Sequence, residues 1–310
     1  MTTPFPLLRL PRLALIPVFQ HMEPSEIIAS SLLSNRAKNL VKILWKTSVN
    51  SINFLVDIND LSILAYLSNY YKPLRLHIKT KPVNGTISLS KWLERVLDVL
   101  NSYSIFQINL HGSPGLDVSD ALTILKEVRY LYIMANCPNS FAKKALEILT
   151  PVTTETVMFK IPFESQEELE IFMKSNKKYL SIFIEGFSKL KFKMDAFLVS
   201  NSLRLLLREK SLSARSIKEF LSNWLQNEHH SPLEHLTMII DESVDRLELL
   251  EGLGAAPFSE ERTFHYSKEL EILPNTFSGG YDIRRINGKK ATISFEDGYQ
   301  GTRFDFYVWP

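Results

Sequence analysis

The sequence predicts an α/β protein in which a helical N-terminal block precedes an open, curved and mostly parallel sheet with helices on one side. Three observations lead to this fold class. Apolar runs punctuated by prolines fill the start of the chain, and from residue 104 onward β-type runs alternate with helix-type segments. Near the C-terminus, two alternating runs flank Asn287-Gly288, a dipeptide typical of tight β-hairpins.

The N-terminal block is expected to be helical. Its apolar residues are concentrated in LPRLALIPVFQHM and EIIASSLLSNRAKNLV, with breaks at Pro11, Pro17 and Pro24. Pro17 should shorten or kink the first helix, because proline lacks the amide hydrogen that bonds to the preceding turn. The apolar positions spread around more than one helical face, so part of this surface is expected to need a partner.

The central region is expected to alternate strands with helices. Ser165 precedes Glu167 and Glu168, which is typical of a helix start, because acidic side chains suit the positive end of a helix. The strand runs are rich in β-branched, aromatic and leucine residues. They read SIFQINLHG, RYLYIMANCP, TETVMFKIPF, YLSIFIEGF, LRLLLRE and LEHLTMIID.

The spacing of these strands favours a leucine-rich-repeat-like region. Strand starts recur roughly every 23 to 32 residues, close to the period of such repeats. In VRYLYIMANC, the apolar residues Val128, Leu131 and Ile133 occupy the inward positions of the repeat, and Asn136 stands at the asparagine position. A doubly wound sheet would show the same alternation, but it usually carries a glycine-rich turn after its first strand, and the chain has none. The repeat interpretation is therefore preferred.

The C-terminal segment predicts a small β element that caps the last repeat. YDIRRINGKKATISF forms the hairpin, and RFDFYVW supplies a third strand with aromatic residues at Phe304, Phe306 and Tyr307. LPNTFSGG, which precedes the hairpin and contains Gly279-Gly280, is interpreted as a linking loop.

Composition excludes several classes of function. The net charge of +2 gives no general electrostatic attraction to nucleic acid. The single cysteine, Cys137, cannot form an intramolecular disulfide, which favours a cytoplasmic or nuclear protein. No apolar run is long enough to span a membrane. Export is not expected, because Pro17 interrupts the apolar stretch and QHMEP follows where a cleavage site should stand.

No catalytic or metal-binding pattern stands out, so the chain is predicted to be no enzyme and to hold no cofactor or metal. A nucleophile motif of the G-x-S-x-G type is absent, and Cys137 is expected to be buried. NEHHSPLEH contains His229, His230 and His235, but it is interpreted as a polar helix end followed by a surface loop. EGLGAAPF is interpreted as a helix stop and turn.

The N-terminal block resembles the F-box, a short helical motif. Leu10-Pro11 match the opening Leu-Pro pair of the motif, and the apolar positions that follow match without a gap. SLLSNR (31–36) matches its S-L-V-S-K-R run, and Trp45 matches its trailing tryptophan. Leu13, Pro17 and Ala37 depart from the usual motif, which bears on the geometry and strength of docking. The rest of the chain resembles the nematode F-box proteins with an F-box-associated type 2 region, whose ending is similar to YDIRRINGKKATISF and the FYVW that follows.

The resemblance implies a substrate receptor of a Skp–cullin–F-box ubiquitin ligase, with no nucleic-acid or membrane partner. An F-box at 1–48 would bind a Skp-type adaptor, and through it a cullin-RING ligase. A β-α region at 49–275, completed by a β-hairpin part at 276–310, would bind an unknown target protein. The residues expected to bind the adaptor are Leu10, Pro11, Leu13, Ile16, Val18, Phe19, Met22, Ile28 and Leu32.

Two other functions remain open at this stage. The N-terminal helices could simply cap the first repeat, since repeat arrays need a closed end. The chain would then be an interaction scaffold with no link to ubiquitination. An enzyme of unrecognised type would require a pocket with perturbed histidine or carboxylate side chains.

Overall fold

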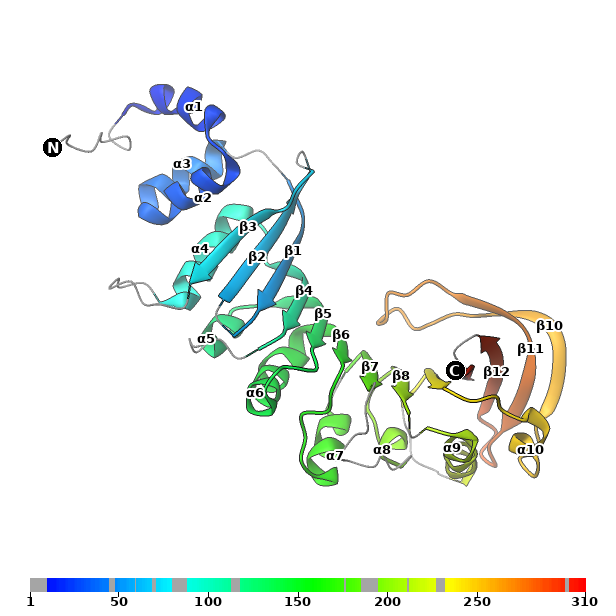
Figure 1. The fold of residues 1–310 in the computed structure, drawn as a ribbon. Helices are drawn as coiled ribbons and strands as arrows, with labels where there is room; N and C mark the ends of the chain where they lie inside the picture. Colours follow the sequence, from blue (N-terminus) through cyan, green and yellow to red (C-terminus); the bar gives the residue numbers. More distant parts are fainter. Residues whose placement is uncertain are drawn as a thin grey trace. The chain divides into compact units, whose positions relative to one another are not determined.

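The computed structural model describes residues 10–44, 48–58, 60–68, 71–79, 88–112, 118–175, 177–184, 195–210, 212–226, 232–298 and 301–310. The chain divides into two compact units. The first comprises Met1–Leu131 and Asn136–Val152, and the second comprises Tyr132–Ala135 and Thr153–Pro310. Each unit is a mixed α/β structure (Figure 1).

The first unit begins with helices and continues as a sheet. Its helices are α1 (Arg12–His21), α2 (Pro24–Leu33), α3 (Asn35–Leu44), α4 (Leu89–Leu100), α5 (Ser119–Leu122) and α6 (Asn139–Leu149), followed by the 3-10 turn η2 (Thr150–Val152). Its strands are β1 (Val49–Val56), β2 (Asp60–Leu67), β3 (Leu74–Lys79), β4 (Ser104–Leu110) and β5 (Glu127–Ile133), whose last two residues belong to the second unit.

The sheet of the first unit differs from the expected parallel arrangement. Its strand order is β3-β2-β1-β4-β5, in which β1–β2 and β2–β3 are antiparallel and β1–β4 is parallel. The links β1–β2 and β2–β3 are short, whereas a parallel pair needs a crossover of a dozen or more residues. The prediction of parallel pairing is therefore wrong for the pairs β1–β2 and β2–β3, whereas β1 and β4 are parallel.

The second unit contains the alternation that the sequence predicts. Its strands are β6 (Thr153–Met158), β7 (Tyr179–Ile184), β8 (Arg204–Glu209), β9 (His235–Ile240), β10 (Ala256–Phe264), β11 (Asn275–Arg284), β12 (Lys290–Gly298) and β13 (Gly301–Val308). Its helices are α7 (Gln166–Lys174), α8 (Asp195–Leu198), α9 (Ala214–Gln226) and α10 (Arg246–Leu250).

Strands β6, β7, β8 and β9 are parallel neighbours, and α7, α8 and α9 lie along one side of them (Figure 1). Strand–helix alternation is thus confirmed here. Leu233, Leu236 and Met238, which follow the inward repeat register, are buried. A leucine-rich-repeat character in the stricter sense stays a prediction.

The C-terminal strands extend the sheet of the second unit as antiparallel neighbours, in the order β9-β13-β12-β11-β10. The predicted hairpin is confirmed: β11 and β12 pair, and Gly288 adopts a φ of +88° in the turn between them. The third strand, β13, is the one that pairs with β9, so Phe306 stands opposite Leu236.

The segment LPNTFSGG is not the linking loop that the sequence predicts. From Asn275 onward it forms β11, which pairs on its other side with β10, a strand that the sequence analysis did not identify. Gly280 is needed within the strand because its φ is +148° and a Cβ there would lie 2.4 Å from the carbonyl oxygen of Ile293. Glycine inside a strand often marks such a close backbone approach.

The core of the second unit is built on the face of the sheet that carries the helices. Phe306 on β13 is fully buried, and its ring contacts Phe220 and Trp224 of α9 edge-on, with centroid distances of 5.2 and 5.1 Å. These contacts join the antiparallel C-terminal strands to a crossover helix of the parallel region.

Among the described helices, none combines the length and apolar character needed to cross a membrane.

Replacing Phe306 with alanine should lower the free energy of unfolding by about 3–5 kcal/mol, because the substitution removes a buried ring and leaves a cavity. Urea denaturation followed by circular dichroism measures the change. Ile286→Ala is the matched control, because Ile286 is fully exposed at the hairpin turn and its loss should change stability by less than about 0.5 kcal/mol. Equal effects of the two substitutions would contradict this packing.

Candidate functional site

The three N-terminal helices have clear local causes. Pro11 precedes α1, and the amide of Met22 ends the helix by donating to the carbonyl of Phe19. The sequence analysis expected Pro17 to shorten or kink α1, but the helix continues through this residue to His21, so it is not shortened. Glu23 and Glu26 form a capping box at the start of α2, in which the side chain of each residue accepts a hydrogen bond from the backbone amide of the other.

Helices α2 and α3 are held against α4. The Arg95 guanidinium donates to the carbonyl oxygen of Leu32 at 3.2 Å. Asp98 accepts ion pairs from Lys42 at 2.5 Å and from Lys38 at 3.0 Å. The hydrogen bond from Lys42, together with that from Lys38, lowers the pKa of Asp98. A hydrogen bond and two ion pairs therefore attach α2 and α3 to α4.

The nine residues predicted to bind an adaptor divide by exposure. Phe19 and Ile28 are buried within the chain itself, as is Leu15, which lies one turn before Phe19. Pro11 is exposed and Leu13 is 82% exposed. The other five, Leu10, Ile16, Val18, Met22 and Leu32, are half-buried. Buried members hold the helices together, and the exposed and half-buried members are the ones that a partner could contact.

Two further apolar side chains on these helices are exposed, and the sequence analysis missed both. Leu33, the last residue of α2, is 73% exposed, and Ile43 near the end of α3 is 50% exposed. Motif matching did not find them because it assigns positions, not the direction in which each side chain points. Trp45, which the resemblance matched to the motif's tryptophan, lies outside the described residues.

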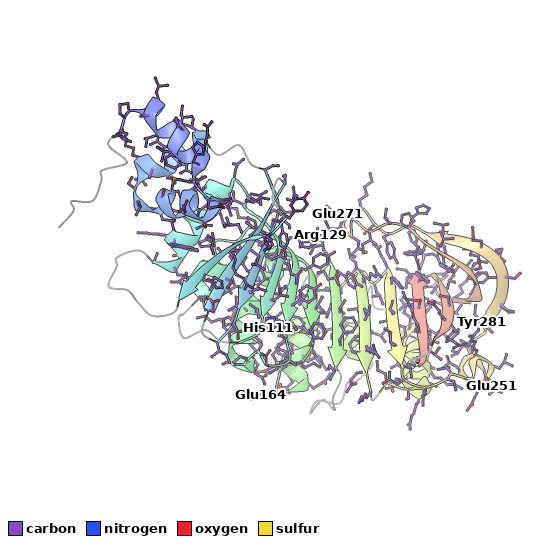
Figure 2. The ribbon with its side chains drawn as sticks, turned by 45° about the horizontal axis from the view of Figure 1, so that its top comes forward. His111, Arg129, Glu164, Glu251, Glu271 and Tyr281 are labelled. Carbon is purple, nitrogen blue, oxygen red and sulfur yellow. The ribbon has the colours of Figure 1, made fainter. Side chains whose placement is uncertain are left out.

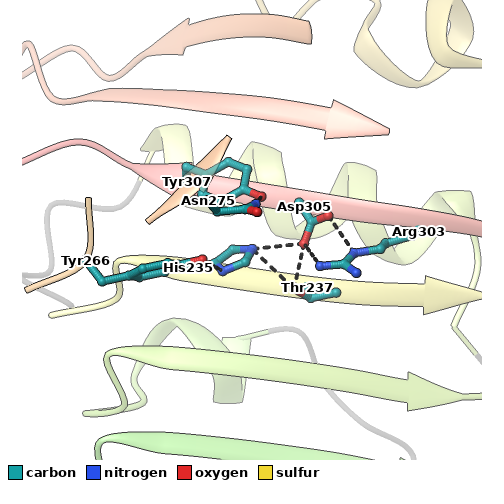
Figure 3. Close-up of polar contacts among 7 residues, drawn as sticks. All are labelled: His235, Thr237, Tyr266, Asn275, Arg303, Asp305 and Tyr307. Atoms are coloured by element: carbon teal, nitrogen blue, oxygen red, sulfur yellow. Dashed lines mark hydrogen bonds and ion pairs between the residues drawn. The ribbon is translucent and has the colours of Figure 1, made fainter. Parts of the chain in front are cut away.

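Away from the N-terminal helices, a cluster of polar side chains lies on β9 and β13 (Figure 3). The Asp305 carboxylate accepts hydrogen bonds from His235 Nε2 at 2.9 Å, Thr237 Oγ1 at 2.6 Å and Arg303 Nε at 2.7 Å. The hydroxyl of Tyr266 reaches the other ring nitrogen of His235 at 2.9 Å. The cluster thus ties two strands to the segment between β10 and β11.

The ionisation states in this cluster follow from burial and pairing. Burial opposes the charge of Asp305, but the hydrogen bonds and charges of His235 and Arg303 outweigh it and lower its pKa to about 2. Burial lowers the pKa of His235, so its ring is neutral. Since a carboxylate only accepts, His235 donates a hydrogen bond from Nε2 and accepts one from the Tyr266 hydroxyl at Nδ1.

This hydrogen-bonded chain does not resemble an activated nucleophile. Burial raises the pKa of Tyr266 to about 12, whereas a nucleophilic or basic group needs a pKa closer to neutral pH. His235 belongs both to the predicted strand run LEHLTMIID and to NEHHSPLEH, which was interpreted as a polar helix end and surface loop. The structure instead places it, fully buried, in β9, because a carboxylate on β13 satisfies its ring. His229 and His230 lie outside the described residues.

A serine, a histidine and an aspartate also meet in the first unit. Ser62 Oγ lies 3.0 Å from His77 Nδ1, and Asp60 Oδ2 lies 2.7 Å from the same nitrogen. In a hydrolytic triad, the serine and the acid contact opposite nitrogens of the ring. Ser62 and Asp60 share one nitrogen, so this group has the geometry of a hydrogen-bonded surface cluster.

Within the ranges given above, no group of histidine, cysteine and acidic residues could hold a metal ion, and Cys137 is buried.

Asp305→Asn should change how stability depends on pH. The folded-state pKa of Asp305 lies below its ordinary value of 3.8, so its carboxylate stabilises the fold above about pH 4, and this contribution is lost as the pH falls toward 2. We expect the wild type to lose roughly 2 kcal/mol more than the variant over this range. Urea denaturation at a series of pH values measures it. Asp120→Asn, at an exposed aspartate on α5, should leave the pH dependence unchanged; a variant at Asp305 that matched the wild type would contradict the assignment.

Comparison with protein families gives two matches. The family model described as the F-box domain matches residues 7–49, which include α1, α2 and α3. The family model described as F-box associated matches residues 168–238, which run from α7 into β9 and include His235. No curated protein and no solved structure matches the chain significantly. The chain thus carries an F-box domain, followed by a region that matches the F-box-associated family.

Proposed function

We propose that this protein is a substrate receptor of a Skp–cullin–F-box ubiquitin ligase. Helices α1, α2 and α3 bind a Skp-type adaptor, and the F-box-associated region holds a target protein. F-box proteins are generally adaptors and not enzymes, so the receptor contributes proximity and orientation. The remaining subunits and the ubiquitin-conjugating enzyme supply the chemistry. A receptor of this kind works in the cytoplasm or the nucleus.

The observation that carries this proposal is the match of the F-box family to helices that expose apolar side chains. Leu15 and Phe19 of α1 point into the chain, yet Leu13 of the same helix is 82% exposed. Leu33 of α2 is also largely exposed. Exposed apolar groups on a small helical domain are typical of a surface that another protein covers.

A scaffold with no link to ubiquitination is the alternative function. It is favoured by the contacts of α2 and α3 with α4, because Arg95 and Asp98 hold these helices as a cap would be held. A pure cap has no need of exposed leucines on its outer side. The two functions therefore differ in whether an adaptor binds the N-terminal helices.

Leu13→Glu and Leu33→Glu should each weaken adaptor binding by about tenfold or more, because a charge replaces an apolar group at the centre of an interface. Co-expression with a Skp-type adaptor and co-purification measure retention, and titration of the purified full chain gives the affinity. Both side chains are exposed, so the thermal transition of each variant should match that of the wild type.

Ile286→Glu is the matched control, because Ile286 is fully exposed on the hairpin of the second unit. It should bind the adaptor as the wild type does. Leu10→Ala combined with Pro11→Ala tests the two residues that open the motif and should also reduce binding. Absence of adaptor binding by the wild type would refute the receptor function and leave the scaffold.

A further inference from the structure

The face of the second unit's sheet that carries no helix presents a defined set of side chains. Because side chains alternate along a strand, β8 buries Leu205 and Leu207 on the helix side and sends Arg204, Leu206 and Arg208 to the other face. In the view of Figure 2 this face comes forward. Strands β7 and β8 belong to the stretch that matches the F-box-associated family.

Arg204 is the unusual member of this set. Its guanidinium lies over the ring of Tyr179 at 4.5 Å and over the ring of Tyr266 at 5.4 Å. Its Nε is buried and has no hydrogen-bond acceptor, and no carboxylate of the described part of the chain lies within ion-pair distance of it. Two rings attract the cation, but neither ring supplies an acceptor for its buried Nε.

A buried donor without an acceptor is costly, and a guanidinium held between two rings is well placed to pair with an anion. The acidic groups on the same face are already engaged. Asp305 accepts from His235, Thr237 and Arg303, and Glu155 accepts from Ser181 Oγ at 3.3 Å. A carboxylate of a bound partner could therefore pair with Arg204 without displacing an existing ion pair of the described residues.

An apolar surface lies at the other end of the same strands. Phe159 and Phe183 are half-buried and stacked, with their ring centroids 5.8 Å apart. Phe183 stands opposite Arg208 in the register of β7 and β8, as Tyr179 stands opposite Arg204. The Phe183–Arg208 pair is four residues along the strands from the Tyr179–Arg204 pair, which corresponds to about 13 Å.

We propose that this face binds an extended acidic segment of the target protein. A carboxylate of the segment pairs with Arg204, and an apolar side chain about four residues away packs on Phe159 and Phe183. This inference rests on the proposed receptor function, since it names the substrate class of the same region. Planar, bidentate recognition of a carboxylate suits a guanidinium that two rings hold in place.

An oriented library of twelve-residue peptides with one fixed phenylalanine tests the proposal. The full chain, purified with a Skp-type adaptor, should enrich aspartate or glutamate three to five residues from the phenylalanine. Arg204→Gln should abolish this enrichment and weaken the affinity for a selected peptide by about tenfold or more. Replacing the acidic residue of that peptide with its amide should weaken binding to the wild type by a similar factor.

Arg215→Gln is the matched control, because Arg215 is an exposed arginine on α9, on the side that carries the helices. It should leave both enrichment and affinity unchanged. If Arg204→Gln does not fold, Arg204→Lys keeps the charge but loses the planar fork, and its affinity for the selected peptide should fall several-fold. Thermal unfolding and adaptor binding report folding of every variant.

Three results would overturn the proposal: no enrichment of acidic residues by the wild type, equal enrichment by Arg204→Gln, or an affinity of Arg204→Lys equal to that of the wild type. Selection of phosphoserine peptides with no binding of their glutamate counterparts would also overturn the assignment of a carboxylate. Adaptor binding is read in the same samples. If the wild type does not bind the adaptor, the receptor function is contradicted. If it binds the adaptor but does not enrich acidic residues, only the proposal that the helix-free face binds an acidic segment is contradicted.

Discussion

Alternation of side chains along each strand is the constraint on which the second unit depends. Successive residues point to opposite faces of a sheet, so one set packs against helices while the other stays available. On β13 this places Phe306 against Phe220 and Trp224 of α9, and it places Asp305 on the opposite face. A shift of one residue in register would exchange the two sets. Core packing therefore determines which side chains a target protein can meet.

The buried polar cluster on β9 and β13 contacts Arg204 on the helix-free face through Tyr266. Tyr266 donates to His235, and the same tyrosine ring covers Arg204. His235 is in turn held by Asp305, so a network within β9 and β13 fixes the segment that packs beside the arginine. The cluster has no activated nucleophile, and under the proposed function it positions the surface that binds the target protein. In the first unit, Asp98 and Arg95 similarly fix α2 and α3, while Leu13 and Leu33 stay exposed.

Much of this architecture could be predicted from the sequence, and the failures have physical causes. Strong apolar periodicity identified the alternation of β6 to β9 with helices, and Asn287-Gly288 identified the hairpin. Strand β10 was missed because its residues are mostly exposed and lack an apolar alternation, so only pairing with β11 defines it. The strand containing His235 was predicted, but the burial of its ring was not, because its partner, Asp305, is 70 residues away in the sequence. The exposure of Leu33 and the burial of Phe19 depend on how the helices pack, which a motif does not encode.

Hydrogen–deuterium exchange of the full chain, with and without a Skp-type adaptor, tests whether the N-terminal helices bind the adaptor. We expect the adaptor to slow exchange in the amides of residues 10–44, where these helices lie, and to leave exchange in the amides of β6 to β9 unchanged. Because backbone amides report the site of contact without any substitution, the result does not depend on the folding of variants. Unchanged exchange across residues 10–44 at saturating adaptor, or protection confined to the second unit, would contradict it.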